Sequence, residues 1–118
     1  MGSFSCPLHL TSLDGERSLD VDATVDAGSD FTTLPSGVLT GMGVEPTGSR
    51  GFRLADGRQV ELQYGHAWAT INRESVITLV VFGDENSPPL LGAYTLEGLA
   101  LAVDPLAQRL VPRQMIMY

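Results

Sequence analysis

One aspartate in the first quarter of the chain stands where a carboxylate can be presented for acid–base chemistry. Residues 19–25 alternate between apolar and polar types, Asp26 follows directly, and Gly28 comes two positions later. Alternation of this kind predicts a half-buried strand, and a glycine just beyond it lets a turn bring the backbone close around the carboxylate. The sequence therefore predicts an aspartate at the end of a strand, placed to take a proton from water or to donate one.

A second feature lies about sixty residues further along the chain, where Leu90 and Leu91 run into Gly92 and a short helical pattern covers residues 93–99. Together with the Asp26 turn and the segment 31–35 that follows it, this order resembles the retropepsin-like aspartic peptidases, in particular their small bacterial single-domain members. The resemblance covers residues 4–112. It implies an all-β fold, a closed barrel with one short C-terminal helix, that acts as a homodimer.

The resemblance also implies roles for individual residues. It matches residues 47–52 to the flap that closes over a bound peptide, a lid whose glycines permit opening. Retroviral members carry an arginine after the glycine of the second feature, and this chain has Ala93 there. The implied catalytic residue is Asp26; the active-site loop is Ala27, Gly28 and Ser29; the substrate-binding residues are Asp30, Thr47, Gly48, Ser49, Arg50, Gly51 and Phe52; and the supporting turn is Leu90, Leu91 and Gly92.

Peptide hydrolysis of this kind requires two carboxylates that share one proton, one to activate water and the other to donate to the carbonyl. The chain offers one such aspartate, so we expect a two-fold dimer whose axis passes between Asp26 and its copy. The implied activity is an aspartic endopeptidase that cleaves a peptide or protein substrate, favours acidic pH, and needs neither a metal nor an organic cofactor.

Ala27 lies between Asp26 and Gly28, where the resembling family carries a threonine or serine. In that family the hydroxyl bonds across the dimer axis to the partner's backbone. Alanine cannot make this bond, and losing a buried hydrogen bond costs about 1 kcal/mol in each subunit. Two functions therefore stay open: an aspartic peptidase, or a catalytically weak or inactive module of the same fold that binds peptides or mediates dimerisation.

Composition narrows the class of protein and its partners. The 118 residues predict a single domain, 1–118, and carry 14 acidic against seven basic residues, for a formal charge of −7. That charge repels nucleic acid, and we interpret it as serving solubility rather than a cationic partner. One cysteine, Cys6, allows no internal disulfide, and no run is long and apolar enough to span a membrane. We therefore expect a cytoplasmic protein, with residues 1–3 a cloning remnant or disordered.

Turn-forming residues divide the chain into short segments. The pairs Asp14-Gly15 and Asp56-Gly57 predict tight hairpin turns, and Asn72, Arg73 and Glu74 predict another turn. Residues 76–82 are nearly all apolar or β-branched, which predicts a strand buried on both faces. Strands are expected at residues 6–13, 19–25, 60–71, 76–82, 100–103 and 109–112, short helical segments at 38–42 and 93–99, and a mobile loop or hairpin at 45–53.

The histidines and the remaining aspartates of the first hairpin are interpreted as structural or surface residues. His9 and His66 have no further histidine or cysteine at metal-ligand spacing, so no metal site is predicted. Asp20 and Asp22 alternate with core positions, which is typical of a solvated strand face.

Two aromatic residues and two serines are the other candidates for contact with a ligand. Trp68 lies amid strand residues and is expected in the core, whereas Phe52 is equally open to packing and to ligand contact. Ser29 and Ser36 lie outside any Gly-x-Ser-x-Gly motif, so no serine nucleophile is expected.

Overall fold

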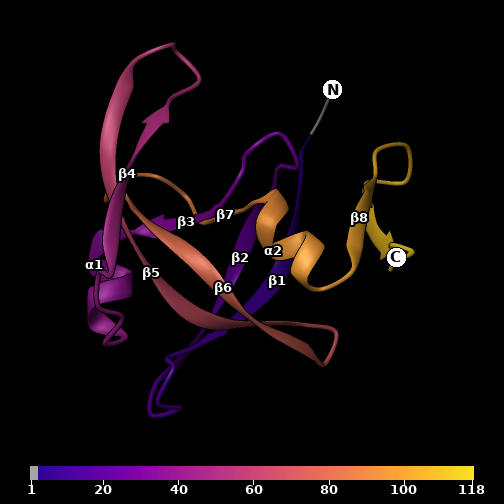
Figure 1. Cartoon of the computed structure of the whole chain (residues 1–118), viewed down its shortest axis with the longest axis horizontal. Helices are drawn as coiled ribbons and strands as arrows, with labels where there is room; N and C mark the ends of the chain where they lie inside the picture. Colours follow the sequence, from indigo (N-terminus) through magenta and orange to yellow (C-terminus); the bar gives the residue numbers. More distant parts are fainter. Residues whose placement is uncertain (1–2) are drawn as a thin grey trace.

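The computed structural model describes residues 3–118, which contain nine β-strands and two short helices (Figure 1). The mainly β prediction is confirmed, and the second helix is the predicted C-terminal one. The prediction for residues 1–3 falls mostly on residues 1 and 2, which lie outside the described part. In chain order the elements are β1 (Phe4–Thr11), β2 (Ser18–Val25), β3 (Thr32–Pro35), α1 (Ser36–Gly41), β4 (Gly48–Arg53), β5 (Gln59–Ile71), β6 (Glu74–Gly83), β7 (Leu90–Leu91), α2 (Ala93–Gly98), β8 (Leu101–Asp104) and β9 (Arg109–Pro112).

Seven strands pair in one sheet, in the order β1-β2-β7-β3-β6-β5-β4. Residues 9–11 of β1 also pair with residues 68–70 of β5, so the pairings from β1 to β5 run in a ring and β4 lies outside it. Most neighbours are antiparallel, but β2 pairs with β7, and β3 with β6, in parallel. The parallel pair of β2 and β7 joins the two sequence features that suggested a site.

Alternation along the strands decides which side chains form the core. On β2, Ala23 and Val25 are buried while Asp20 and Asp22 are exposed, as predicted. The core draws on every strand of the ring and on both helices. Its buried members are Leu8, Leu10, Ala23, Val25, Leu34, Leu39, Met42, Val44, Ala67, Ala69, Ile71, Val80, Phe82, Leu91, Leu96 and Leu99.

The turn between β1 and β2 is closed by its own polar groups. The Asp14 carboxylate accepts bonds from the Ser12 hydroxyl at 2.6 Å and from the Glu16 N–H at 2.9 Å. Gly15 has a φ of +76°, a left-handed conformation that favours glycine. These contacts explain why Asp14-Gly15 forms the hairpin turn that the sequence predicts.

Trp68 does not lie in the core, and the prediction for it is wrong. Its neighbours on β5, Ala67 and Ala69, are fully buried, so alternation places the indole on the outer face of the strand. There it is 37% exposed, opposite Ile77 of β6, which is 47% exposed. Burial at this strand follows the parity of the positions rather than the size of the side chains.

Strand β6 carries the predicted buried segment over only part of its length. Residues 78–83 are all buried, whereas Ile77 is exposed. The preceding turn consists of Asn72 and Arg73, with φ of 51° and 70°, the left-handed pair typical of a two-residue hairpin. Glu74, expected in that turn, belongs instead to β6 and pairs with Ile71.

After α2 the chain forms a separate two-stranded sheet, β8 with β9. Figure 1 shows it beyond α2, with the C-terminus beside it. Leu101, Val103 and Leu110 pack against the core from this pair. Within residues 3–118, none of the helices has the length and apolar character that crossing a membrane would require.

Candidate active site

Asp26 lies directly after β2, at the place where β2 runs parallel to β7. Its N–H donates to the Leu91 carbonyl at 3.0 Å, so the strand pairing extends one residue into the loop. Its carboxylate Oδ1 accepts the Gly28 N–H at 3.0 Å, and its carbonyl accepts the Ser29 N–H at 3.1 Å. A Cβ at position 28 would lie 3.2 Å from that Oδ1, a tight contact. The turn therefore fixes the carboxylate through the backbone and leaves Asp26 exposed.

The start of α2 is bonded to the loop that carries Asp26. The Ala93 N–H donates to the Ser29 carbonyl at 2.8 Å, and the Tyr94 N–H donates to the Asp30 carbonyl at 2.9 Å. These bonds satisfy N–H groups that the first turn of a helix leaves without partners. The loop and the helix consequently hold each other in position.

Gly92 allows the loop and α2 to approach this closely. A Cβ added at Gly92 would lie 2.5 Å from the carbonyl carbon of Phe31, a separation that real side chains do not adopt. Leu91 is fully buried, and Leu90 pairs with both Thr24 of β2 and Thr33 of β3. The three residues of the predicted supporting turn lie beneath the loop, although none of them lines the space above it.

Three buried threonines form a hydroxyl network under the same loop. Thr95 Oγ1 of α2 lies 2.6 Å from Thr32 Oγ1 of β3 and 2.8 Å from Thr78 Oγ1 of β6. Thr32 Oγ1 also accepts the Gly92 N–H at 3.2 Å. Because all three threonines are at most 1% exposed, the network ties three elements together away from water. The sequence does not predict that these three residues meet, because they are far apart along the chain.

The hairpin of β4 and β5 rises on the same side of the molecule as the loop between β2 and β3, which carries Asp26 (Figure 1). Its register pairs Arg50 with Leu62 and Phe52 with Val60, so these four side chains share one face. The Phe52 ring contacts the Phe31 ring edge to face, with centroids 6.1 Å apart, which turns that face toward the loop.

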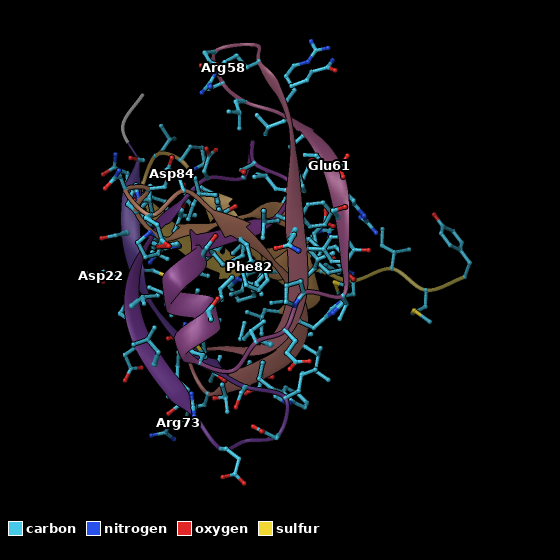
Figure 2. The ribbon with its side chains drawn as sticks, turned by 90° about the vertical axis from the view of Figure 1, so that its left-hand side faces the viewer. Asp22, Arg58, Glu61, Arg73, Phe82 and Asp84 are labelled. Atoms are coloured by element: carbon cyan, nitrogen blue, oxygen red, sulfur yellow. The ribbon has the colours of Figure 1, made fainter. Side chains whose placement is uncertain are left out.

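The tip of this hairpin lies outside the range predicted for the flap. Its turn is residues 54–58, closed by the Leu54 N–H, which donates to the Arg58 carbonyl at 2.8 Å. Figure 2 shows Arg58 at this end of the molecule. Residues 47–52 therefore form the base and one arm of the hairpin, and the tip and the second arm were missed. The signal was present, because Asp56-Gly57 predicts the turn and its second arm must face the same side.

Between loop and hairpin lies a cleft of about 930 Å³. Of the predicted site residues, Asp26, Gly28, Ser29, Asp30, Arg50, Gly51 and Phe52 line it. The other predicted flap and loop residues, Ala27, Thr47, Gly48 and Ser49, do not. Ser49 has the opposite parity to Arg50, and its hydroxyl donates to Glu61 at 3.0 Å on the outer face.

Several lining residues are not among the predicted site residues. They lie on the tip and second arm of the hairpin, around β3, and at the end of β6 with its loop. These residues are Phe31, Thr33, Ser36, Arg53, Leu54, Ala55, Arg58, Val60, Leu62, Val81, Phe82, Gly83, Asp84 and Ser87. The parallel pairing of β3 with β6 brings the lining residues at the end of β6 beside the Asp26 loop.

The histidines and the cysteine are the residues to consider for a metal site. His9 pairs with Asp20 across β1 and β2 at 2.8 Å, on the surface as predicted. Burial, and then the negative charge of Asp22, raise the pKa of the Cys6 thiol. Among residues 3–118, no group of three or more histidine, cysteine or acidic side chains gathers to hold a metal ion.

The fold that brings Asp26 and the hairpin to one cleft is similar to the folds of two retroviral proteases. The chain is similar to EIAV protease complexed with the inhibitor HBY-793, with a TM-score of 0.59 and 15% identity over 93% of each chain. It is also similar to the protease of simian foamy virus (mac), with a TM-score of 0.53 and 15% identity over 78% of this chain and 92% of that one. No family model matches the chain, and no curated protein matches it. The likeness confirms a retropepsin-like fold.

Proposed function

We propose that this protein is a cytoplasmic aspartic endopeptidase, built as a closed retropepsin-like barrel and active as a homodimer. One observation carries the proposal: Asp26 is exposed at the floor of a cleft, held by the Gly28 N–H, with a hairpin as the roof. A carboxylate fixed in this way is preorganised for acid–base chemistry. The retropepsin-like fold supports the same reading, because the two similar structures are proteases.

The chemistry requires the second copy of the chain. The ionised Asp26 of one copy takes a proton from water, whose oxygen attacks the peptide carbonyl carbon. The partner's Asp26, in its neutral form, donates a proton to the carbonyl oxygen. When the tetrahedral intermediate collapses, the carbon–nitrogen bond breaks and a proton passes to the nitrogen. Two carboxylates brought together by a two-fold axis share one proton, so activity favours acidic pH.

An extended peptide fits a cleft of this shape. β4 lies outside the ring of pairings, and the cleft runs along the hairpin that it forms with β5. Backbone groups of an extended peptide bind such a surface by strand-like hydrogen bonds. The alternating side chains on the inner face of the hairpin would then contact the substrate's side chains.

A comparison of the wild-type protein with Asp26→Asn tests the proposal. Both proteins would be incubated with a mixed peptide library between about pH 4 and pH 7, the range in which a carboxylate dyad changes its protonation. Products would be identified by mass spectrometry. Cleavage by the wild type and none by Asp26→Asn is the expected result. Equal cleavage by both would assign the activity elsewhere.

A second candidate function rests on Ala27. Because this residue has no hydroxyl to bond across a dimer axis, the same fold could serve as a module that binds peptides or mediates dimerisation with little or no catalysis. The two candidates differ in the same experiment. A folded, dimeric wild-type protein that binds peptides without cleaving them, and an Asp26→Asn variant that binds equally well, would favour the binding module.

A further inference from the structure

Arg50 is a cation on the roof of the cleft. Within residues 3–118, the basic side chains that contact a carboxylate are His9, with Asp20, and Arg58, with Asp56, so Arg50 has no carboxylate partner there. Its guanidinium carbon lies instead 4.9 Å from the centroid of the Tyr64 ring and 5.7 Å from that of Phe31. Stacking on aromatic rings holds a guanidinium by its faces, so its N–H donors stay available around the edge.

The position of Arg50 in the hairpin directs it into the cleft. It lies opposite Leu62, two positions from Phe52, on the face that turns toward Phe31. Arg53 also lines the cleft, but it has the opposite parity on β4. Arg58 lines the cleft at the tip of the hairpin, where it pairs with Asp56. Arg50 is therefore the cation on the inner face of β4, beside the apolar and aromatic side chains of Phe52, Leu62 and Tyr64.

The charges on the two sides of the cleft have opposite signs. Asp26, Asp30 and Asp84 line the side away from the hairpin, and Arg50 lines the hairpin side. In an extended peptide, successive side chains point in opposite directions. A side chain that points to the hairpin meets Arg50, and its neighbours point toward the aspartates. A carboxylate is the group whose geometry a free guanidinium edge matches best.

We infer that Arg50 is a specificity-determining residue that pairs with the carboxylate of an aspartate or glutamate side chain in the bound peptide. This inference rests on the proposed peptide-binding function and adds to it the chemical class of substrate. The formal charge of −7 on the chain repels acidic peptides in general. A preference for an acidic side chain at one position is therefore the opposite of what the net charge predicts.

Matched peptides that differ by one charge test this inference. A set of fluorogenic peptides would place glutamate, glutamine or lysine at each position in turn, at about pH 6, where a glutamate is ionised. The wild type should prefer glutamate by about tenfold in kcat/KM at one position, as a charge-assisted hydrogen bond predicts. Arg50→Gln should abolish this ratio, and Arg50→Glu should reverse it in favour of lysine. A wild-type ratio near one at every position would overturn the inference.

Two arginine variants control for general charge effects. Arg73→Gln removes a charge from the turn at the opposite end of the molecule from Arg58 (Figure 2) and should leave the ratio unchanged. Arg53→Gln removes a charge from the same strand, at a cleft-lining position of opposite parity to Arg50, and should also keep the ratio, whatever its effect on the overall rate. A loss of the ratio in Arg73→Gln would assign the preference to the overall charge of the protein, and a loss in Arg53→Gln would assign it to Arg53. Either result would contradict the inference.

A binding measurement separates this inference from the proposed catalysis. The Asp26→Asn variant, with and without Arg50→Gln, would be titrated with the labelled glutamate and glutamine peptides, and binding followed by fluorescence anisotropy. If the wild type cleaves no peptide but Asp26→Asn binds the glutamate peptide more tightly through Arg50, the inference stands and the peptidase proposal fails. If neither peptide binds and neither is cleaved, both are overturned.

Discussion

Two small neighbours of Asp26 have different effects on its turn. The structure explains the glycine at position 28, because its N–H donates to the Asp26 carboxylate and a Cβ there would lie 3.2 Å from Oδ1, a tight contact. Ala27 makes no side-chain contact in the cleft and is exposed. In the proposed dimer its side chain is therefore free to face the second copy. The dimer dissociation constant then depends in part on whether the side chain at position 27 can donate a hydrogen bond.

Restoring a hydroxyl at this position should tighten the dimer. Ala27→Thr is expected to lower the dimer dissociation constant by about tenfold or more, because two symmetric hydrogen bonds contribute about 1 kcal/mol each. Sedimentation equilibrium would measure the constant. Ala27→Val is the matched control, since it has the shape of threonine without the hydroxyl. Equal dimer affinity for the Thr and Val variants would contradict this account.

Asp14 provides a prediction about pH. The Ser12 hydroxyl bond, followed by the Glu16 N–H bond, lowers the pKa of the Asp14 carboxyl below its usual range. A folded-state pKa below the unfolded one means that the stabilisation is present above about pH 4 and is lost as the pH falls through the folded value. Asp14→Asn should therefore lower the free energy of unfolding at pH 7 and have a smaller effect at lower pH.

Urea titrations at pH 7 and at about pH 2.5, on either side of the titration of a free aspartate, would measure this difference. Glu16→Gln is a suitable control, because it removes a charge from the same turn while keeping the backbone N–H that bonds to Asp14. An Asp14→Asn effect of the same size at both pH values would show that charge has no part in closing the turn.

At the scale of elements, α2 determines how well the Asp26 loop is supported. The helix has only six residues, Ala93–Gly98, too few to be stable by itself. It is held at its start by the carbonyls of Ser29 and Asp30 and on its buried side by the threonine network. β3, β6 and α2 are therefore fixed relative to one another by hydroxyl groups within an apolar core.

Removing the central hydroxyl of this network should destabilise the protein. Thr95→Val keeps the side-chain shape but leaves the hydroxyls of Thr32 and Thr78 without their shared partner, at a cost of about 1–3 kcal/mol. Chemical denaturation would give the free energy of unfolding. Thr70→Val is the control: it breaks a similar 2.7 Å hydroxyl pair with Ser75 near the surface, and we expect about 0.5 kcal/mol or less. Similar losses for the two variants would contradict a special role for burial.

At the scale of the whole molecule, the proposed site is shared by two chains, and mixing experiments can detect this. At constant total protein, replacing half of the wild type with Asp26→Asn should reduce activity to about a quarter, because random pairing leaves that share of dimers with two aspartates. A monomeric enzyme would keep about half. Activity per molecule should also fall on dilution through the dimer dissociation constant.

The sequence predicted the parts of this molecule that depend on local order. The Asp26 turn, the Asp14-Gly15 and Asp56-Gly57 hairpins and the short C-terminal helix follow from patterns a few residues long. The threonine network and the β3 and β6 residues of the cleft could not be predicted in the same way, because they meet through the pairing of strands that are distant in sequence. Trp68 was misplaced because its parity is set by its neighbours, Ala67 and Ala69.

The bond between the Asp26 N–H and the Leu91 carbonyl has a consequence for the time at which the site forms. During synthesis the chain emerges from its N-terminus, so the β1–β2 hairpin is complete long before β7 exists. Contacts between segments so far apart in sequence form slowly, because a long loop must close first. The turn that presents Asp26 thus lacks its support until residues 90 and 91 of β7 have been made. If the proposed peptidase function holds, a nascent chain would therefore lack a formed catalytic turn until it has folded.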